Sequence, residues 1–434
     1  MLSNQQLCVG LSLAVTWFSG NAWRRSDSHV EDILNPTYYI NIAKLAENAH
    51  VDFLFRPDSL FVDPKALSHS VGFCALEPTL LMAAIAPHTS HIGLLTTAST
   101  TFNEPYIIAR QLQSLHHISH GRAAWNIVTA LDGHENFGLP HMPDVGIRYA
   151  KAKEFAIAVK KLWRSFPHEA LTIDRNEGKF VTSELITTPD VKGNFFSVKG
   201  PMSLPMHDSG EVPLFQAGAS EEGRDFAAQI ADGIFAACPD IDSAKSYRDD
   251  VRARMQKYQR DANKVKVLPG LSLYLAASEE QAKALYLESQ SSLDISRKNQ
   301  FICDSLGIDI TQLTEETKIS ASLIGPFPDH VRSRTHSELL RRLVKRETLT
   351  LAELRKRPEV SASAHWQIVG TVEQAADEII EWFEEGAIDG FIALPGGSEE
   401  CLKLVCEKLL PLLAERGYFR RQYSHTTLRG HLSE

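Results

Sequence analysis

The feature that most constrains the fold of this chain is a regular alternation of short apolar runs with longer helical patterns. Apolar runs of this length are typical of strands buried on both faces. No hairpin signal joins two consecutive runs, so the sequence predicts an α/β fold with an all-parallel sheet. Eight strands close most economically into a (β/α)8 TIM barrel; a doubly wound open sheet is the alternative, because order along the chain does not establish closure. The predicted strands are 7–15, 51–55, 91–97, 123–129, 212–217, 233–237, 268–276 and 390–394.

Two segments are longer than ordinary connections between a strand and a helix. Residues 166–210 are rich in Gly, Pro, Asp and Thr, and 292–366 carry helical patches at 337–345 and 351–356. Long excursions in barrel enzymes are usually lids or interface elements. We therefore expect a single domain over residues 1–434 with these two insertions, the second serving as a lid. The predicted helices are 37–49, 78–87, 106–116, 149–165, 222–231, 242–261, 279–291, 372–385 and 400–415.

Composition excludes several classes of protein. The net charge of −9 and the lack of a Lys/Arg block argue against a nucleic-acid partner. The six cysteines have no CxxC spacing, which indicates free thiols in a reducing compartment. The apolar run 7–15 lacks a basic segment before it and a clear cleavage site after it, so we interpret it as a buried strand and not as a signal peptide. The expected protein is soluble and cytoplasmic, with no membrane contact.

Two short segments carry the polar residues of greatest interest. In GRAAWNIVT (121–129), Asn126 lies inside a strand that is otherwise apolar, and a buried amide is costly unless it is hydrogen-bonded. Polar groups near the carboxyl ends of parallel strands are where α/β proteins contact ligands. Ser220 follows the fifth predicted strand and opens a helix, so it is either a plain N-cap or part of an anion site. Glu221 and Glu222 favour the plain cap, because they would repel a phosphate.

The same segments resemble the bacterial luciferase-like flavin monooxygenases. GRAAWNIVT is preceded by STTFNEPYIIARQLQSL (99–115), and the match continues at QAGASEEGRDFA (216–227) and GTVEQAADEIIEWFEEGAIDGF (370–391). It closes with RGYF (416–419) and TLR (427–429). The similarity is greatest to the branch that contains nitrilotriacetate monooxygenase component A, dibenzothiophene sulfone monooxygenase and long-chain alkane monooxygenase. These matches follow the family's order over nearly the whole chain.

The resemblance implies a set of flavin contacts. It assigns Ala219, Ser220 and Tyr149 to the FMN phosphate, and Asp58 and Thr97 to the flavin. From local sequence alone, the aspartate is a turn or cap residue, the threonine a good strand former and the tyrosine a helix-staple aromatic. Two positions depart from the family pattern, which often has His at position 145 and Ser at position 130.

Val145 and Ala130 therefore remove two polar contacts from the predicted flavin site. Each net hydrogen bond lost costs about 0.5–1.5 kcal/mol. Reduced flavin then binds loosely, unless neighbours such as Asn126, His134 or His141 compensate.

The implied activity is insertion of one oxygen atom from O₂ at a C–H, C–N or C–S centre. By resemblance, the cofactor is FMNH₂ supplied by a separate NAD(P)H:flavin reductase, the oxidant is a C4a-(hydro)peroxyflavin, and the protein is a homodimer or homotetramer. The alternatives are an F420-dependent oxidoreductase of the same fold and a non-catalytic flavin-binding protein. A luciferase-like aldehyde oxidiser is less consistent with the branch matched.

Candidates for the remaining roles come from loops near the predicted carboxyl ends of the strands. His134 and His141 are the candidates for a catalytic acid or base, although loop histidines are more commonly solvated. Trp17, Trp23 and Arg56 are the candidates for substrate contacts, with core packing or surface charge as the alternatives. Arg24 and Arg25 could also receive an anionic substrate. We predict no metal site and no Rossmann, Walker or GxSxG motif, because the spacings that these sites require are absent from the sequence.

Overall fold

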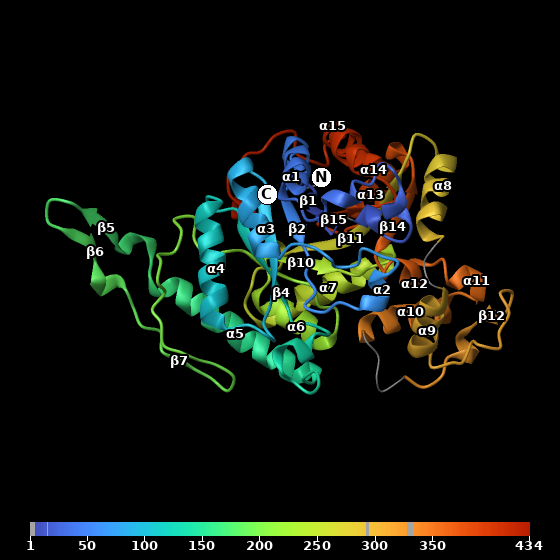
Figure 1. Cartoon of the computed structure of the whole chain (residues 1–434), viewed down its shortest axis with the longest axis horizontal. Helices are drawn as coiled ribbons and strands as arrows, with labels where there is room; N and C mark the ends of the chain where they lie inside the picture. The colour runs from blue at the N-terminus through green and yellow to red at the C-terminus, as the bar shows by residue number, and fades with distance from the viewer. Residues whose placement is uncertain (1–4, 15, 292–294, 328–332) are drawn as a thin grey trace.

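Eight parallel strands close into a barrel with helices around it (Figure 1). The computed structural model describes residues 5–14, 16–291, 295–327 and 333–434. The barrel order is β1-β2-β3-β4-β9-β10-β11-β15, and β15 pairs with β1 to complete the circle. The predicted (β/α)8 TIM barrel is thus confirmed. The strands are Cys8–Ser12 (β1), Phe53–Arg56 (β2), Gly93–Ser99 (β3), Ala123–Val128 (β4), Leu214–Gln216 (β9), Gly233–Ala236 (β10), Lys266–Leu275 (β11) and Gly390–Pro395 (β15).

Each predicted strand coincides with one of these eight, and each predicted helix coincides with a helix of the outer layer. Many helices begin at a side chain that caps a backbone N–H, as Ser220, Asp240 and Thr371 do. Val15, the end of the first predicted strand, lies outside the described residues. The helices of the outer layer are Pro36–Asn48 (α1), Pro78–Ile85 (α3), Pro105–Ile118 (α4), Val145–Ser165 (α5), Glu221–Ile230 (α6), Ile241–Lys257 (α7), Glu279–Gln290 (α8), Val372–Glu384 (α13), Glu399–Leu404 (α14) and Leu410–Glu415 (α15). A π-helical turn, Val405–Leu409, joins the last two.

The main sheet is all-parallel as predicted, but the first insertion contains hairpins that the sequence did not predict. The segment 166–210 contains two antiparallel pairs, Leu171–Asp174 (β5) with Lys179–Val181 (β6) and Val191–Lys192 (β7) with Ser197–Val198 (β8). The β5–β6 pair projects away from the barrel (Figure 1). Its strands have only four and three residues and no buried one, which is too short for a strand pattern to stand out in the sequence.

The second insertion forms a small helical unit with its own apolar core. Helices Ile295–Leu306 (α9) and Arg334–Arg346 (α10) pack together, and Lys318–Ile319 (β12) pairs with Leu349–Thr350 (β13). Residues 292–294 and 328–332 of the predicted insertion lie outside the described residues. Two short helices, Leu351–Leu354 (α11) and Pro358–Ser361 (α12), complete the unit. The core residues include Ile302, Leu306, Ile319, Leu340, Leu343 and Leu351.

A ninth parallel strand, Trp366–Gly370 (β14), was not predicted. It pairs with the carboxyl half of β11, whose amino half pairs with β10. The insertion therefore ends against the barrel, and it ends one residue before the boundary that the sequence predicted. This short strand has only five residues, and its apolar side chains are interrupted by Gln367, which is why it resembles a loop in the sequence.

The barrel interior is apolar at one end and polar at the other. Cys8, Phe53 and Phe215 fill the amino end together with Leu428 and Leu432 of the C-terminal helix Leu428–Leu432 (α16). Buried polar residues on the same inward face gather at the carboxyl ends of β1, β3 and β4. These are Ser12, Thr97, Ser99 and Asn126. In a barrel of this kind, the carboxyl end is the face that carries the active site.

Candidate active site at the carboxyl end of the barrel

Thr97 and Asn126 form a hydrogen-bonded pair on adjacent strands. The register of β3 and β4 places them side by side. The Asn126 amide nitrogen donates to the Thr97 hydroxyl at 3.0 Å, and that hydroxyl donates to the Arg56 carbonyl at 2.7 Å. Both side chains are buried, yet the Asn126 carbonyl oxygen Oδ1 has no hydrogen-bond partner among the described residues. A buried acceptor of this kind is costly, so its position favours a ligand that donates a hydrogen bond.

The loop after β9 forms a close-packed turn beneath a tyrosine hydroxyl. A Cβ at Gly218 would lie 2.8 Å from the Tyr149 hydroxyl and 2.9 Å from the Gly223 Cα, and it would also overlap the Gln216 amide. Burial raises the pKa of Tyr149, and interactions with Ser220, Thr129 and Gln216 oppose that rise. The turn therefore requires glycine at position 218, because the Tyr149 hydroxyl lies where a side chain would be.

Ser220 caps helix α6 as predicted, since its hydroxyl accepts from the Gly223 N–H at 3.1 Å. The carbonyls of the same loop are held by two residues that the sequence analysis missed. The Tyr247 hydroxyl donates to the Gly218 carbonyl at 2.7 Å, and the Arg224 Nε donates to the Ala219 carbonyl at 2.8 Å. The Arg224 contact is local, because α6 begins at this loop. Tyr247 comes from the neighbouring helix α7, which no local sequence pattern connects to the loop.

The loop after β4 is held by an arginine that was also missed. Ala130 has a left-handed backbone with φ of 48°, which is unusual for a residue with a Cβ. Its carbonyl accepts from the Arg148 guanidinium, which also contacts the Thr129 carbonyl at 3.4 Å. Burial lowers the pKa of Arg148. The arginine directly precedes Tyr149 on α5, so one turn of this helix secures the loops after β4 and β9.

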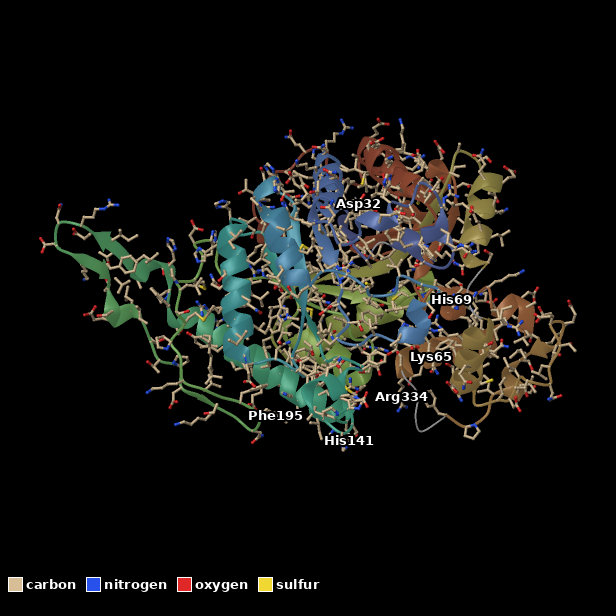
Figure 2. The ribbon with its side chains drawn as sticks, in the orientation of Figure 1. Asp32, Lys65, His69, His141, Phe195 and Arg334 are labelled. Carbon is tan, nitrogen blue, oxygen red and sulfur yellow. The ribbon has the colours of Figure 1, made fainter. Side chains whose placement is uncertain are left out.

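The remaining predicted flavin and catalytic residues lie around these loops. Asp58 is half-buried after β2, and burial and nearby Glu77 raise its pKa. Val145 begins α5 and is 43% exposed. His134 is half-buried with its Nδ1 buried and unpartnered among the described residues, whereas His141 is exposed at the molecular surface (Figure 2).

Arg56 is buried, so the reading of it as a surface charge was wrong. Its side chain is 3% exposed, donates to the Leu13 carbonyl and lies 6.0 Å from the centre of the Tyr39 ring on α1. Burial lowers its pKa. Its register partner is Thr96, which faces α3 through a 3.0 Å hydrogen bond to Thr79. The guanidinium is therefore directed into the layer between the barrel and its helices.

The other predicted substrate residues lie in the short helical turns after β1. Trp17 is 1% exposed in the main core, where its ring contacts Phe18 and Tyr38. Trp23 is partly buried, and its indole nitrogen donates to the His69 carbonyl at 3.3 Å. Arg24 is exposed, and Arg25 forms ion pairs with acidic neighbours.

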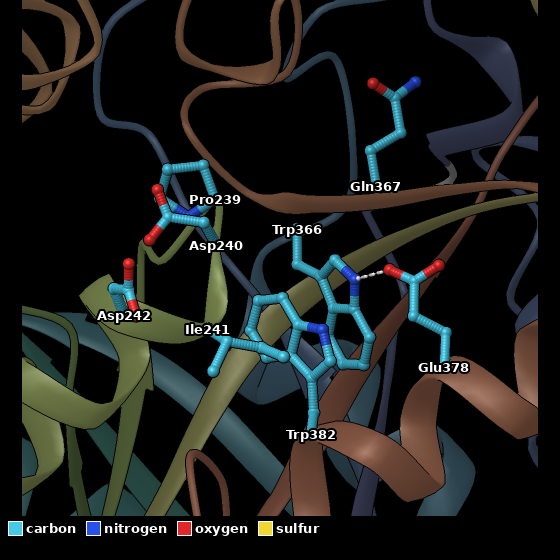
Figure 3. A pocket seen from close by; sticks show the side chains of 8 residues that line it. All are labelled: Pro239, Asp240, Ile241, Asp242, Trp366, Gln367, Glu378 and Trp382. Atoms are coloured by element: carbon cyan, nitrogen blue, oxygen red, sulfur yellow. Dashed lines mark hydrogen bonds between the residues drawn. The ribbon is translucent and has the colours of Figure 1, made fainter. Parts of the chain in front are cut away.

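Two surface cavities lie beside β14 and α13. One has a volume of about 370 Å³ and is floored by the stacked rings of Trp366 and Trp382, with the Trp366 indole donating to Glu378 at 2.7 Å (Figure 3). The other, of about 550 Å³, shares Glu378 and Trp382 with it. In the described part of the chain, no group of three or more His, Cys, Asp or Glu residues could hold a metal ion. None of the helices described there is both long and apolar enough to span a membrane.

The chain is similar to known proteins over most of its length. Residues 16–390 match the luciferase-like monooxygenase family. The chain is 37% identical to nitrilotriacetate monooxygenase component A of Aminobacter aminovorans, with 100% of this chain and 97% of the relative covered. It is 34% identical to dibenzothiophene-sulfone monooxygenase of Rhodococcus erythropolis, with 95% and 92% covered.

A solved structure of riboflavin lyase with modified FMN and riboflavin superimposes with a TM-score of 0.83 at 27% identity, covering 99% of this chain and 96% of that one. The protein studied here belongs to the luciferase-like monooxygenase family, and it is a monooxygenase with the TIM barrel of that family.

Proposed function

We propose that this protein is the oxygenase component of a two-component system and uses reduced FMN to insert one oxygen atom from O₂ into a small organic substrate. The observation that carries the proposal is that two features occur at the same end of the barrel: a buried hydrogen-bond acceptor without a donor, and a turn that is already formed. The Asn126 Oδ1 atom lacks a donor, and the turn at Gly218 has no room for a side chain beneath Tyr149. A flavin fits both features, because its ring carries N–H donors and its phosphate requires close approach to backbone N–H groups.

Two groups of residues would hold the cofactor. Thr97 and Asn126 would contact the ring, while Tyr149, Ala219 and Ser220 would hold the phosphate at the start of α6. The hydrogen bonds from Tyr247 and Arg224 fix this loop before any ligand arrives, which lowers the entropic cost of binding. Reduced FMN supplies the reactivity toward O₂ that amino-acid side chains lack.

The two departures from the family pattern have compensating neighbours. Ala130 offers no hydroxyl, but Arg148 orders its loop, and Val145 offers no ring nitrogen, but the Tyr149 hydroxyl stands one turn away on the same helix. We therefore expect FMNH₂ to bind without these two contacts. Asp58 would complete the flavin site from the end of β2.

The chain's own contribution to the reaction is to position the ligands and exclude water. His134, whose Nδ1 is buried and unpartnered among the described residues, is the better placed of the two predicted histidines to hold a proton near the reaction. His141 is exposed and would need the loop to close. The substrate side of the site would be shaped by Trp17, Trp23 and Arg56, which lie behind the carboxyl end of β1. The Arg56 guanidinium donates a hydrogen bond to the Leu13 carbonyl there.

A turnover assay with labelled oxygen tests the proposal. The protein is supplied with FMNH₂ by a separate NAD(P)H:flavin reductase under ¹⁸O₂, with nitrilotriacetate as an anionic probe and dibenzothiophene sulfone as a neutral one. Incorporation of ¹⁸O into a product, dependent on the protein, is the expected result. FMNH₂ binding with hydrogen peroxide as the sole product would favour a flavin-binding protein, and turnover with reduced F420 in place of FMNH₂ would favour the F420-dependent alternative.

The remaining expectations belong to the same proposal. The partner is the flavin reductase, the working assembly is a homodimer or homotetramer, and the compartment is the cytoplasm. Sedimentation of the purified protein at several concentrations measures the assembly directly.

A further inference from the structure

His365 lies inside the barrel although it belongs to the second insertion. It is the residue immediately before β14, and the pairing of Trp366 with Leu271 places it beside Gly270 of β11. Gly270 pairs with Ile392, which belongs to the interior cluster, whereas Leu271 belongs to the outer core. Gly270 thus faces inward, and His365 approaches the interior at that point.

The imidazole occupies the space that a side chain at position 270 would fill. A Cβ on Gly270 would lie 2.6 Å from the His365 Nδ1 and 2.8 Å from a ring carbon of Phe235. The centres of the His365 and Phe235 rings are 5.1 Å apart, and Phe235 in turn lies 5.4 Å from Phe55. The ring of Phe235 therefore packs against the histidine, and Phe55 packs behind that ring.

The ring has an unused hydrogen-bonding atom. The Nδ1 atom is buried with no hydrogen-bond partner among the described residues, while the residue as a whole is partly exposed. Burial lowers the pKa of His365 to about 3, with nearby His336 acting in the same direction, so the imidazole is neutral at physiological pH. A neutral imidazole can donate from one ring nitrogen and accept at the other.

The barrel order places this histidine across the interior from the Thr97–Asn126 pair. Around the barrel from β3, the strands β4, β9, β10 and β11 follow in turn. β11 is therefore four strands away from β3 in a barrel of eight, which places it diametrically opposite β3. An eight-stranded barrel is just wide enough for side chains to fill it. A flat tricyclic ring held by one wall at the barrel mouth therefore reaches the other.

We propose that His365 contacts the isoalloxazine ring of bound reduced FMN from the wall opposite Thr97 and hydrogen-bonds it through a ring nitrogen. This inference rests on the proposed function. It assigns the second insertion a role in cofactor binding, because the insertion delivers His365 to the barrel.

Chemical modification with diethyl pyrocarbonate tests the contact without a substrate. The rate of acylation of His365 is measured by peptide mass spectrometry, anaerobically, with and without saturating FMNH₂. Exposed His88, at the end of α3 and outside the barrel, is the internal control. We expect FMNH₂ to slow the modification of His365 at least about tenfold and to leave His88 unchanged.

Equal rates with and without FMNH₂ would overturn the inference while leaving the proposed function intact. A His365 that does not react in the free protein would also overturn it, because the ring would then be sealed in the core. If flavin absorbance shows that FMNH₂ does not bind at all, the proposed function itself fails.

Two variants give an independent readout. Since a phenylalanine fills the space but forms no hydrogen bond, H365F should bind FMNH₂ about three- to tenfold more weakly. H365N retains a donor and an acceptor, and it should stay within about twofold of the unchanged protein. Equal affinity in H365F and the unchanged protein would contradict the hydrogen bond, and melting curves of both variants show whether the fold is kept.

Discussion

The two walls of the barrel mouth are built in different ways. The wall of β3, β4 and β9 consists of residues on the strands and their loops, joined by hydrogen bonds from Asn126 to Thr97 and from there to the backbone. The wall of β10 and β11 consists of packed rings and of His365, which arrives from an insertion. The first wall is fixed by the barrel itself, whereas the second depends on a segment that lies outside the barrel.

Because the two walls are built differently, we expect substitutions on each wall to change ligand binding independently of the other wall. Substitutions on the hydrogen-bonded wall should lower flavin affinity strongly, because its groups have defined partners and neighbouring residues cannot shift to replace them. Substitutions on the packed wall should have smaller effects, because rings held by van der Waals contact can shift. Variants on each wall test this contrast.

Gly218→Val should weaken FMNH₂ binding by at least about 100-fold, roughly 2.7 kcal/mol, because the added side chain occupies the turn beneath Tyr149. Anaerobic titration followed by flavin absorbance measures the dissociation constant. Gly146→Ala is the matched control, since a Cβ there meets no atom within 4 Å. Binding within threefold of the unchanged protein would exclude this turn from the site.

Asn126→Ala should weaken FMNH₂ binding about tenfold, because it removes the unpartnered acceptor and the donor to Thr97, each worth about 0.5–1.5 kcal/mol. The same titration applies, and Asn176→Ala, on the exposed β5–β6 arm, is the control. If the affinity does not change, then the Oδ1 atom of Asn126 faces no ligand.

Gly270→Ala should weaken FMNH₂ binding about threefold on the packed wall, since the added methyl displaces His365 from beside Phe235 without removing its hydrogen-bonding atoms. The acylation rate of His365 should change in the same variant. A loss of affinity as large as that of Gly218→Val would abolish the distinction between the walls.

The packed wall should also contribute to acid lability. His365, with a folded pKa of about 3, is neutral in the folded protein, but the unfolded chain binds its proton near pH 6.5. The stability that this residue contributes is complete above pH 6.5 and is lost as the pH falls toward 3. His116 and His431 act in the same direction, while Asp52, with its pKa raised to about 6, opposes them between pH 4 and 6.

Urea unfolding from pH 7 to pH 4 measures this slope. H365N should make the free energy of unfolding less dependent on pH by up to one proton, or about 1.4 kcal/mol per pH unit. His88→Asn, at an exposed position, should not change the slope. An identical slope in H365N and the unchanged protein would mean that the imidazole already titrates normally in the folded state.

The sequence was sufficient for the barrel because each strand is a compact apolar run bounded by turn residues. Asn126 and Ser220 stand out in the sequence as polar residues at or just beyond strand ends, whereas Thr97 was assigned through the family resemblance. Tyr247 could not be predicted, because only helix packing brings it to the Gly218 carbonyl. Arg148 and Arg224 stand in segments that the sequence singled out, but the carbonyls that they bind depend on how the loops fold. His365 was hidden for a related reason: five residues of β14 resemble a loop until they pair with β11.

The most direct test of the account is an anaerobic titration of the purified protein with FMNH₂, FMN and reduced F420 in parallel. We expect FMNH₂ to bind most tightly and Gly218→Val to abolish this preference. Binding of reduced F420 alone, or of none of the three, would contradict it, because the polar wall and the turn at Gly218 would then serve another ligand.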